Sequence, residues 1–153
     1  MKRLLAVGAV TAAVLALPSV ASAQSGHFVG TQTCTDIGTQ VQCNGKVAGL
    51  GGTTFTITVS AQGTASVTCT NPAGNVAPGQ SFSFAAAGSS GPFPTPRNGQ
   101  SPFTVTTNAP VAPAGSCPNS KWTATVTDVT FTTATISLFE DSTLSDQVTV
   151  PVS

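Results

Sequence analysis

Apolar residues alternate with threonine and serine along most of this chain, at the two-residue period of a β-strand. The alternation is clearest in residues 53–61 and returns in 64–70. Gln62-Gly63 lies between these segments and predicts a two-residue turn, so the two segments together predict a β-hairpin. The inward face of this hairpin is expected to carry Phe55, Ile57, Val59, Ala65, Val67 and Cys69.

Further segments show the same period, and Gly-, Pro- and Asn-rich stretches separate them. The apolar parity slips by one before Val129 and again before Ala134, which is typical of β-bulges or tight corners. We expect seven or eight short antiparallel strands in an Ig-like or Greek-key β-sandwich. Trp122, Ala124 and Val126 alternate in phase and are expected to join the core. The additional predicted strands are 40–48, 81–87, 102–107, 120–127, 129–138 and 146–152, and the predicted loops and turns are 49–52, 71–80, 88–101, 108–119 and 140–145.

The first 23 residues have a different pattern. Lys2 and Arg3 precede an uncharged apolar run, and Ala21-Ser22-Ala23 supplies the small residues that a signal peptidase requires. The sequence therefore predicts a signal peptide with a helical apolar core over 1–23. A single secreted β domain is expected over 24–153, with no membrane span in the mature chain.

Charge is scarce, since charged residues make up 7% of the chain against about a quarter in ordinary domains. The mature chain keeps three basic and five acidic residues, a net charge of −2. Three cations cannot neutralise a run of phosphates, which argues against nucleic-acid binding. We expect a monomer whose partner is an extracellular protein or a cell-wall glycan.

Cys34, Cys43, Cys69 and Cys117 are even in number, and a signal peptide implies an oxidising compartment, so two disulfides are expected. The spacing fits no zinc knuckle. Asp36-Ile37-Gly38 predicts a turn that brings Cys34 and Cys43 together. The favoured pairing is therefore Cys34–Cys43 with Cys69–Cys117.

No catalytic constellation is evident, and no cofactor is expected. His27 is the only histidine and is interpreted as a tail or edge-strand residue. The acids Glu140, Asp141 and Asp146 fall in one predicted turn, where solvated side chains are expected and calcium binding stays open. The enzymatic alternative is an extracellular hydrolase that uses Asp128 and the Glu140–Asp146 acids.

The leading interpretation is therefore a secreted, non-enzymatic β-sandwich protein with a structural or binding role. A protease inhibitor is an alternative, in which the loop Gly91–Asn98 presents Arg97. Among the aromatic residues, Trp122 is expected in the core rather than as a sugar platform. Phe93, set among prolines, is the better candidate for an exposed aromatic.

The stretches VTCTNPAGNVAPGQ (67–80) and CPNSKWTATVTDVTFTTATI (117–136) resemble a group of small secreted bacterial β proteins of uncharacterised function. The resemblance covers most of the mature domain. It implies a secreted β domain and favours the pairing of Cys69 with Cys117. It implies no activity, cofactor or catalytic residue.

Overall fold

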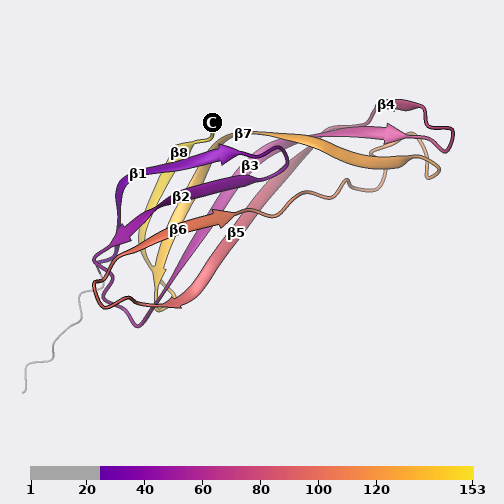
Figure 1. Ribbon diagram of the computed structural model, residues 1–153. Coiled ribbons are helices and arrows are strands. Elements are labelled where there is room, and N and C mark those ends of the chain that lie inside the picture. Colours follow the sequence, from indigo (N-terminus) through magenta and orange to yellow (C-terminus); the bar gives the residue numbers. More distant parts are fainter. Residues whose placement is uncertain (1–24) are drawn as a thin grey trace, which may run out of the picture.

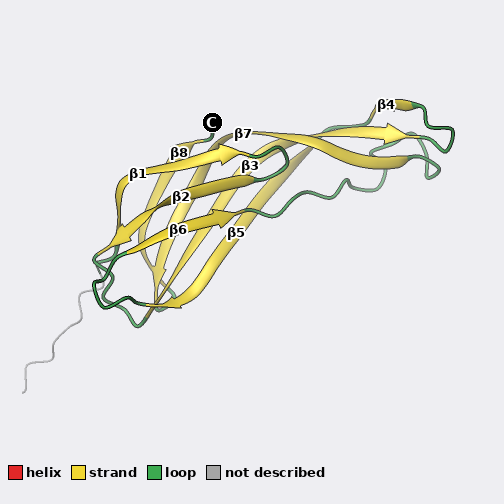
Figure 2. Ribbon diagram, in the orientation of Figure 1, coloured by secondary structure: helices red, strands yellow, loops and turns green. Residues whose placement is uncertain are grey.

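The computed structural model of the protein describes residues 25–153, which consist of strands and loops without a helix (Figure 2). The predicted signal peptide and its cleavage site lie outside these residues. Residues 25–153 contain no helix that could cross a membrane. The strands are β1 (His27–Asp36), β2 (Val41–Ala48), β3 (Thr54–Thr70), β4 (Val76–Pro78), β5 (Phe82–Pro94), β6 (Ser101–Thr106), β7 (Thr123–Glu140) and β8 (Thr143–Pro151).

Two antiparallel sheets pack face to face as a β-sandwich, which confirms the predicted fold class (Figure 1). The smaller sheet has the strand order β1-β2-β6. In the larger sheet β3 pairs with β7 on one side, and β7 pairs with β8. The other side of β3 pairs first with β5 and then, near its end, with β4.

The core lies between the sheets and is built from the inward positions of alternating strands. The larger sheet contributes a central aliphatic group that includes Ile57, Val59 and Ile136, each at most 1% exposed. The smaller sheet contributes Val41 and Val105, which are at most 2% exposed. The outer faces of the sheets carry threonine and serine, whose hydroxyls are hydrated although the faces have few charges. The β-branched side chain of threonine also favours a strand.

The two lateral seams of the sandwich differ. On one side the chain end closes the gap between β1 and β8, because Ser153 N–H donates to the Cys34 carbonyl and Asp36 N–H donates to the Ser153 carbonyl. A parallel bridge between Cys34 and Val152 lies beside these bonds. On the other side β5 and β6 are both edge strands, and no strand pairing joins them within residues 25–153.

β3 and β7 extend past the smaller sheet as a long projection, with β4 paired to β3 at its far end (Figure 1). The loop after β6 reaches along this projection, where Gln80 N–H donates to the Ser116 carbonyl and the Cys69–Cys117 disulfide joins loop and strand. Cys34 and Cys43 are cross-strand partners of β1 and β2 and form the other disulfide. Both predicted pairings are confirmed.

The predicted hairpin at Gln62-Gly63 is wrong, because β3 runs through this dipeptide without a turn. Gly63 pairs with Phe84 on one side and Phe131 on the other. A Cβ at this position would lie 2.6 Å from Cγ1 of Val129 and 2.8 Å from Cδ1 of Phe131. Glycine is therefore needed for close packing rather than for a bend.

Several other boundaries also differ from the sequence prediction. The separate strands expected over 120–138 form one continuous β7. The two parity slips are confirmed as bulges of β7, one between Val126 and Asp128 and one between Phe131 and Ala134, where β7 has one residue more than the facing stretch of β3. β5 continues to Pro94, so the first half of the predicted 88–101 loop is an edge strand. The predicted 71–80 loop contains β4.

The core prediction for 122–126 is wrong in part. Trp122 precedes β7 and is half-buried against the loop after β6, because the smaller sheet does not extend over this end of β7. Ala124 and Val126 are also only half-buried, although Val126 still packs against the core. The predicted inward positions of 53–70 are buried as expected.

Candidate functional site

The acidic turn between β7 and β8 is a structural junction. Glu140 is fully buried, contrary to the expected solvated turn. Its carboxylate accepts hydrogen bonds from Gly51 N–H at 2.7 Å, Gly52 N–H at 3.1 Å, Gly26 N–H at 2.9 Å and the Ser145 hydroxyl at 2.5 Å. Burial alone raises the pKa of Glu140, but these four hydrogen bonds outweigh it and hold the pKa below the ordinary value of 4.5. One carboxylate thus joins the start of β1, the β2–β3 loop and β8.

The neighbouring acids also bind backbone groups. Asp141 and Ser142 both have positive φ and form the two-residue turn between β7 and β8. Hydrogen bonds from the Thr53 hydroxyl, and from Thr54 N–H and Thr53 N–H, hold the pKa of Asp141 well below its ordinary value. Asp146 accepts a hydrogen bond from Phe28 N–H at 2.9 Å. These carboxylates therefore stabilise the end of the sandwich.

The structure does not bring together the carboxylates of the hydrolase alternative. Asp128 is exposed and lies on the same strand as Glu140, twelve residues earlier. At about 3.3 Å per residue this is roughly 40 Å along β7. Within residues 25–153 no group of three or more His, Cys, Asp and Glu side chains is placed to hold a metal ion.

The remaining predicted residues lie apart from one another. His27 is the exposed first residue of β1, an edge strand, as expected, and its Nδ1 lies 2.9 Å from the Ser25 carbonyl. Arg97 is exposed on a tight turn that Gly99 N–H closes onto the Pro96 carbonyl at 2.8 Å. Because β5 includes Gly91–Pro94, the loop proposed for an inhibitor is shorter than expected.

A second hollow lies on the projection, where Trp122 and Ala124 face the loop 112–120. The Trp122 ring is half-buried in this contact, so it packs as part of the loop attachment rather than as an open platform.

The open seam between β5 and β6 forms the candidate binding site. Its closed end is at Ala87, whose N–H donates to Oδ1 of Asn108 and whose carbonyl accepts from Asn108 N–H, both at 2.8 Å. Gly88 lies directly against the Thr106 carbonyl, which a Cβ on Gly88 would approach to 2.5 Å. Beyond this contact the two strands are separated by a groove of about 380 Å³.

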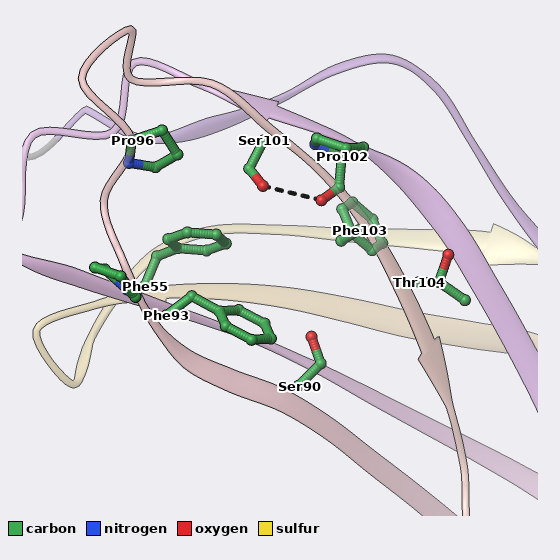
Figure 3. A pocket seen from close by; sticks show the side chains of 9 residues that line it. Phe55, Ser90, Phe93, Pro96, Ser101, Pro102, Phe103 and Thr104 are labelled. Carbon is green, nitrogen blue, oxygen red and sulfur yellow. Dashed lines mark hydrogen bonds between the residues drawn. The ribbon is translucent and has the colours of Figure 1, made fainter.

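Aromatic and proline side chains line the groove (Figure 3). The rings of Phe55 and Phe93 lie side by side with centroids 5.7 Å apart, and Phe103 faces them from β6. Phe55 and Phe103 are nearly buried, whereas Phe93 is 46% exposed. Phe93 is thus the exposed aromatic that the sequence predicted. The complete lining is Phe55, Ser90, Phe93, Pro94, Pro96, Ser101, Pro102, Phe103 and Thr104.

The groove is uncharged, since none of its nine lining residues is Asp, Glu, Lys, Arg or His. Its size is within the range of ligand sites, about 300–1,000 Å³, and its few polar side chains carry hydroxyls. Ser101 uses its hydroxyl to bond the Pro102 carbonyl at 3.0 Å. The arrangement suits binding through apolar contact and neutral hydrogen bonds.

Sequence reasoning singled out Phe93 but did not predict the groove. Phe55 was identified only as an inward residue and Phe103 only as part of the predicted strand 102–107. Their approach to Phe93 depends on which strands form the edges of the two sheets. Comparisons with protein-family models, curated proteins and solved structures give no match for this chain.

Proposed function

We propose that this chain is an exported, non-enzymatic binding protein whose ligand occupies the groove between β5 and β6. The observation that carries the proposal is an exposed aromatic ring, Phe93, at the mouth of an uncharged hollow between two unpaired strand edges. Two disulfides and the closed opposite seam support it, because they hold the groove walls on a rigid scaffold.

The export part of the proposal rests on the predicted signal peptide and on the two intramolecular disulfides, which persist in oxidising compartments. The binding part rests on the contrast between two neighbouring features at one end of the sandwich, where Phe55 pairs with Glu140 on one side and with Phe93 on the other. In the acidic turn the polar groups bind one another, whereas in the groove an apolar surface is left open.

The test uses the protein secreted by cells that express the full chain. It is immobilised and screened against a phage-displayed library of random peptides and against soluble peptidoglycan fragments. We expect at least one binder whose affinity falls at least tenfold in Phe93→Ala, because this change removes the exposed wall of the groove.

Val111→Ala is the matched control, since Val111 is 87% exposed and lies outside the groove. Circular dichroism of both variants establishes that each is folded. The proposal is wrong if neither library yields a binder, or if every binder is equally affected by both substitutions.

A further inference from the structure

The free edge of β6 carries backbone groups that point into the open seam. β6 pairs with β2 alone, in the register Cys43↔Val105 and Asn44↔Thr104. Just beyond these pairs, Thr107 N–H donates to the Val41 carbonyl, so Val41 and Thr107 form a hydrogen-bonded pair. Because hydrogen-bonded and non-hydrogen-bonded pairs alternate in an antiparallel ladder, Val105 bonds toward β2 and Thr104 directs its N–H and carbonyl away from it.

Pro102 fits the same alternation. It is a further non-hydrogen-bonded position, so its missing N–H costs the ladder with β2 nothing. Its outward carbonyl already accepts the Ser101 hydroxyl. Thr104 is therefore the residue of the groove whose backbone offers both a donor and an acceptor.

The facing edge of β5 has a matching arrangement. Ala87 bonds outward to Asn108, so the alternation directs the backbone of Ser89 to the same side. The seam is thus a wedge with unpaired peptide groups on both edges and aromatic rings below. On each edge, backbone N–H and carbonyl groups point outward at every second residue. An extended peptide presents its own N–H and carbonyl groups at the same interval, so it is complementary to such an edge.

We propose that the occupant of the groove is an extended, uncharged peptide segment of a partner protein that pairs with the edge of β6 at Thr104. This inference rests on the proposed function and names the ligand class of that site. The peptide extends the smaller sheet by β-augmentation, and an apolar side chain of the peptide enters between Phe93 and Phe103. The uncharged lining selects against acidic and basic segments, since it provides no partner for a desolvated charge.

The experiment takes a peptide selected in the library screen and synthesises two copies, each N-methylated at alternate residues. N-methylation removes backbone donors and leaves the side chains unchanged. We expect one copy to lose affinity at least tenfold and the other to bind nearly as the parent, because only one edge of the peptide pairs with β6. Hydrogen exchange of the Thr104 amide is expected to slow at least tenfold on binding, while that of Phe103, already bonded to β2, changes little.

Thr104→Pro removes the outward N–H without removing a bond to β2, and it is expected to weaken binding at least tenfold. Val111→Pro is the control, since it introduces a proline at an exposed position outside the groove. If Thr104→Pro does not fold, the N-methylated peptides decide the question with the unaltered protein.

Other outcomes separate the inference from the proposed function. Binding that depends on Phe93 but is indifferent to both N-methylated copies leaves the groove as a site and overturns the strand pairing. Binding of peptidoglycan fragments alone, again dependent on Phe93, also overturns the inference and supports the proposed function. Absence of any Phe93-dependent binder overturns both.

Discussion

Replacing Glu140 tests whether one buried carboxylate holds the acidic end of the sandwich together. In Glu140→Gln the side chain keeps its size, and the amide oxygen can still accept from Gly51 and Gly52. The amide nitrogen then faces Gly26 N–H, a donor against a donor, whereas the Ser145 hydroxyl can rotate and accept. An unsatisfied buried donor costs about 1–3 kcal/mol, and the bonds that remain lose their charge assistance.

We therefore expect Glu140→Gln to lower the free energy of unfolding by about 2–3 kcal/mol at pH 7. Glu140→Ala removes every acceptor and is expected to cost about 4 kcal/mol. Asp128→Asn is the matched control, because it makes the same chemical change at an exposed position and should stay within about 0.5 kcal/mol of the parent. Urea unfolding followed by far-UV circular dichroism measures all three.

The same substitution changes the dependence of stability on pH. The folded-state pKa of Glu140 lies below its unfolded value, so the unfolded chain takes up the proton first as the pH falls. The stabilisation is complete above about pH 5 and is lost as the pH falls through 4.5 and below. Glu140→Gln should lose less stability than the parent between pH 6 and pH 3. Equal stability of Glu140→Gln and Asp128→Asn at pH 7, with unchanged pH dependence, would refute the reasoning.

Four further outcomes are expected. Gly63→Ala should destabilise the protein by about 1–3 kcal/mol in urea unfolding, because its Cβ meets β7 side chains, and a neutral effect would contradict the close packing. Trp122→Ala should cost about 1–2 kcal/mol rather than the 3–5 of a core tryptophan, since the ring is half-buried, and a larger loss measured by circular dichroism would place it in the core. Replacing both cysteines of the Cys34–Cys43 bridge with alanine should lower the free energy of unfolding by about 3 kcal/mol, and the same change at Cys69–Cys117 by about 4 kcal/mol, because the second bridge closes the longer loop. The reverse order in urea unfolding would contradict this loop-length argument. Intact mass of the secreted protein should correspond to cleavage after Ala23, and a mass that retains Met1 would contradict the predicted export.

The continuity of β3 was available in the sequence. A two-residue turn at Gln62-Gly63 would place Ala61 opposite Thr64 and shift the inward positions from odd to even numbers. The apolar residues after the dipeptide, Ala65 and Val67, keep the odd numbering of Phe55 and Ile57. The parity therefore favoured one long strand, although a Gly in a polar dipeptide is a common turn signal.

Tertiary context decides the remaining differences. Residues 92–96 were predicted as part of a loop, whereas 92–94 belong to β5, an edge strand that tolerates proline. Whether such a segment forms an edge strand or a loop depends on whether β3 lies beside it. The burial of Glu140 depends on Gly26 and on the 51–52 loop, which come from distant parts of the chain. The local pattern of apolar and polar residues cannot predict contacts between such distant segments. The groove could not be predicted for the same reason, since its walls come from β3, β5 and β6.

The joined ends of β1 and β8 have a mechanical consequence. The two strands are parallel neighbours, with Gly26 tied to Glu140 at one end and Ser153 tied to Cys34 and Asp36 at the other. Tension applied between residues 26 and 153 therefore runs along the strands, while the hydrogen bonds that connect them run across. Such a load shears these bonds together instead of breaking them one at a time, so this seam is expected to resist tension along the strands better than tension across them.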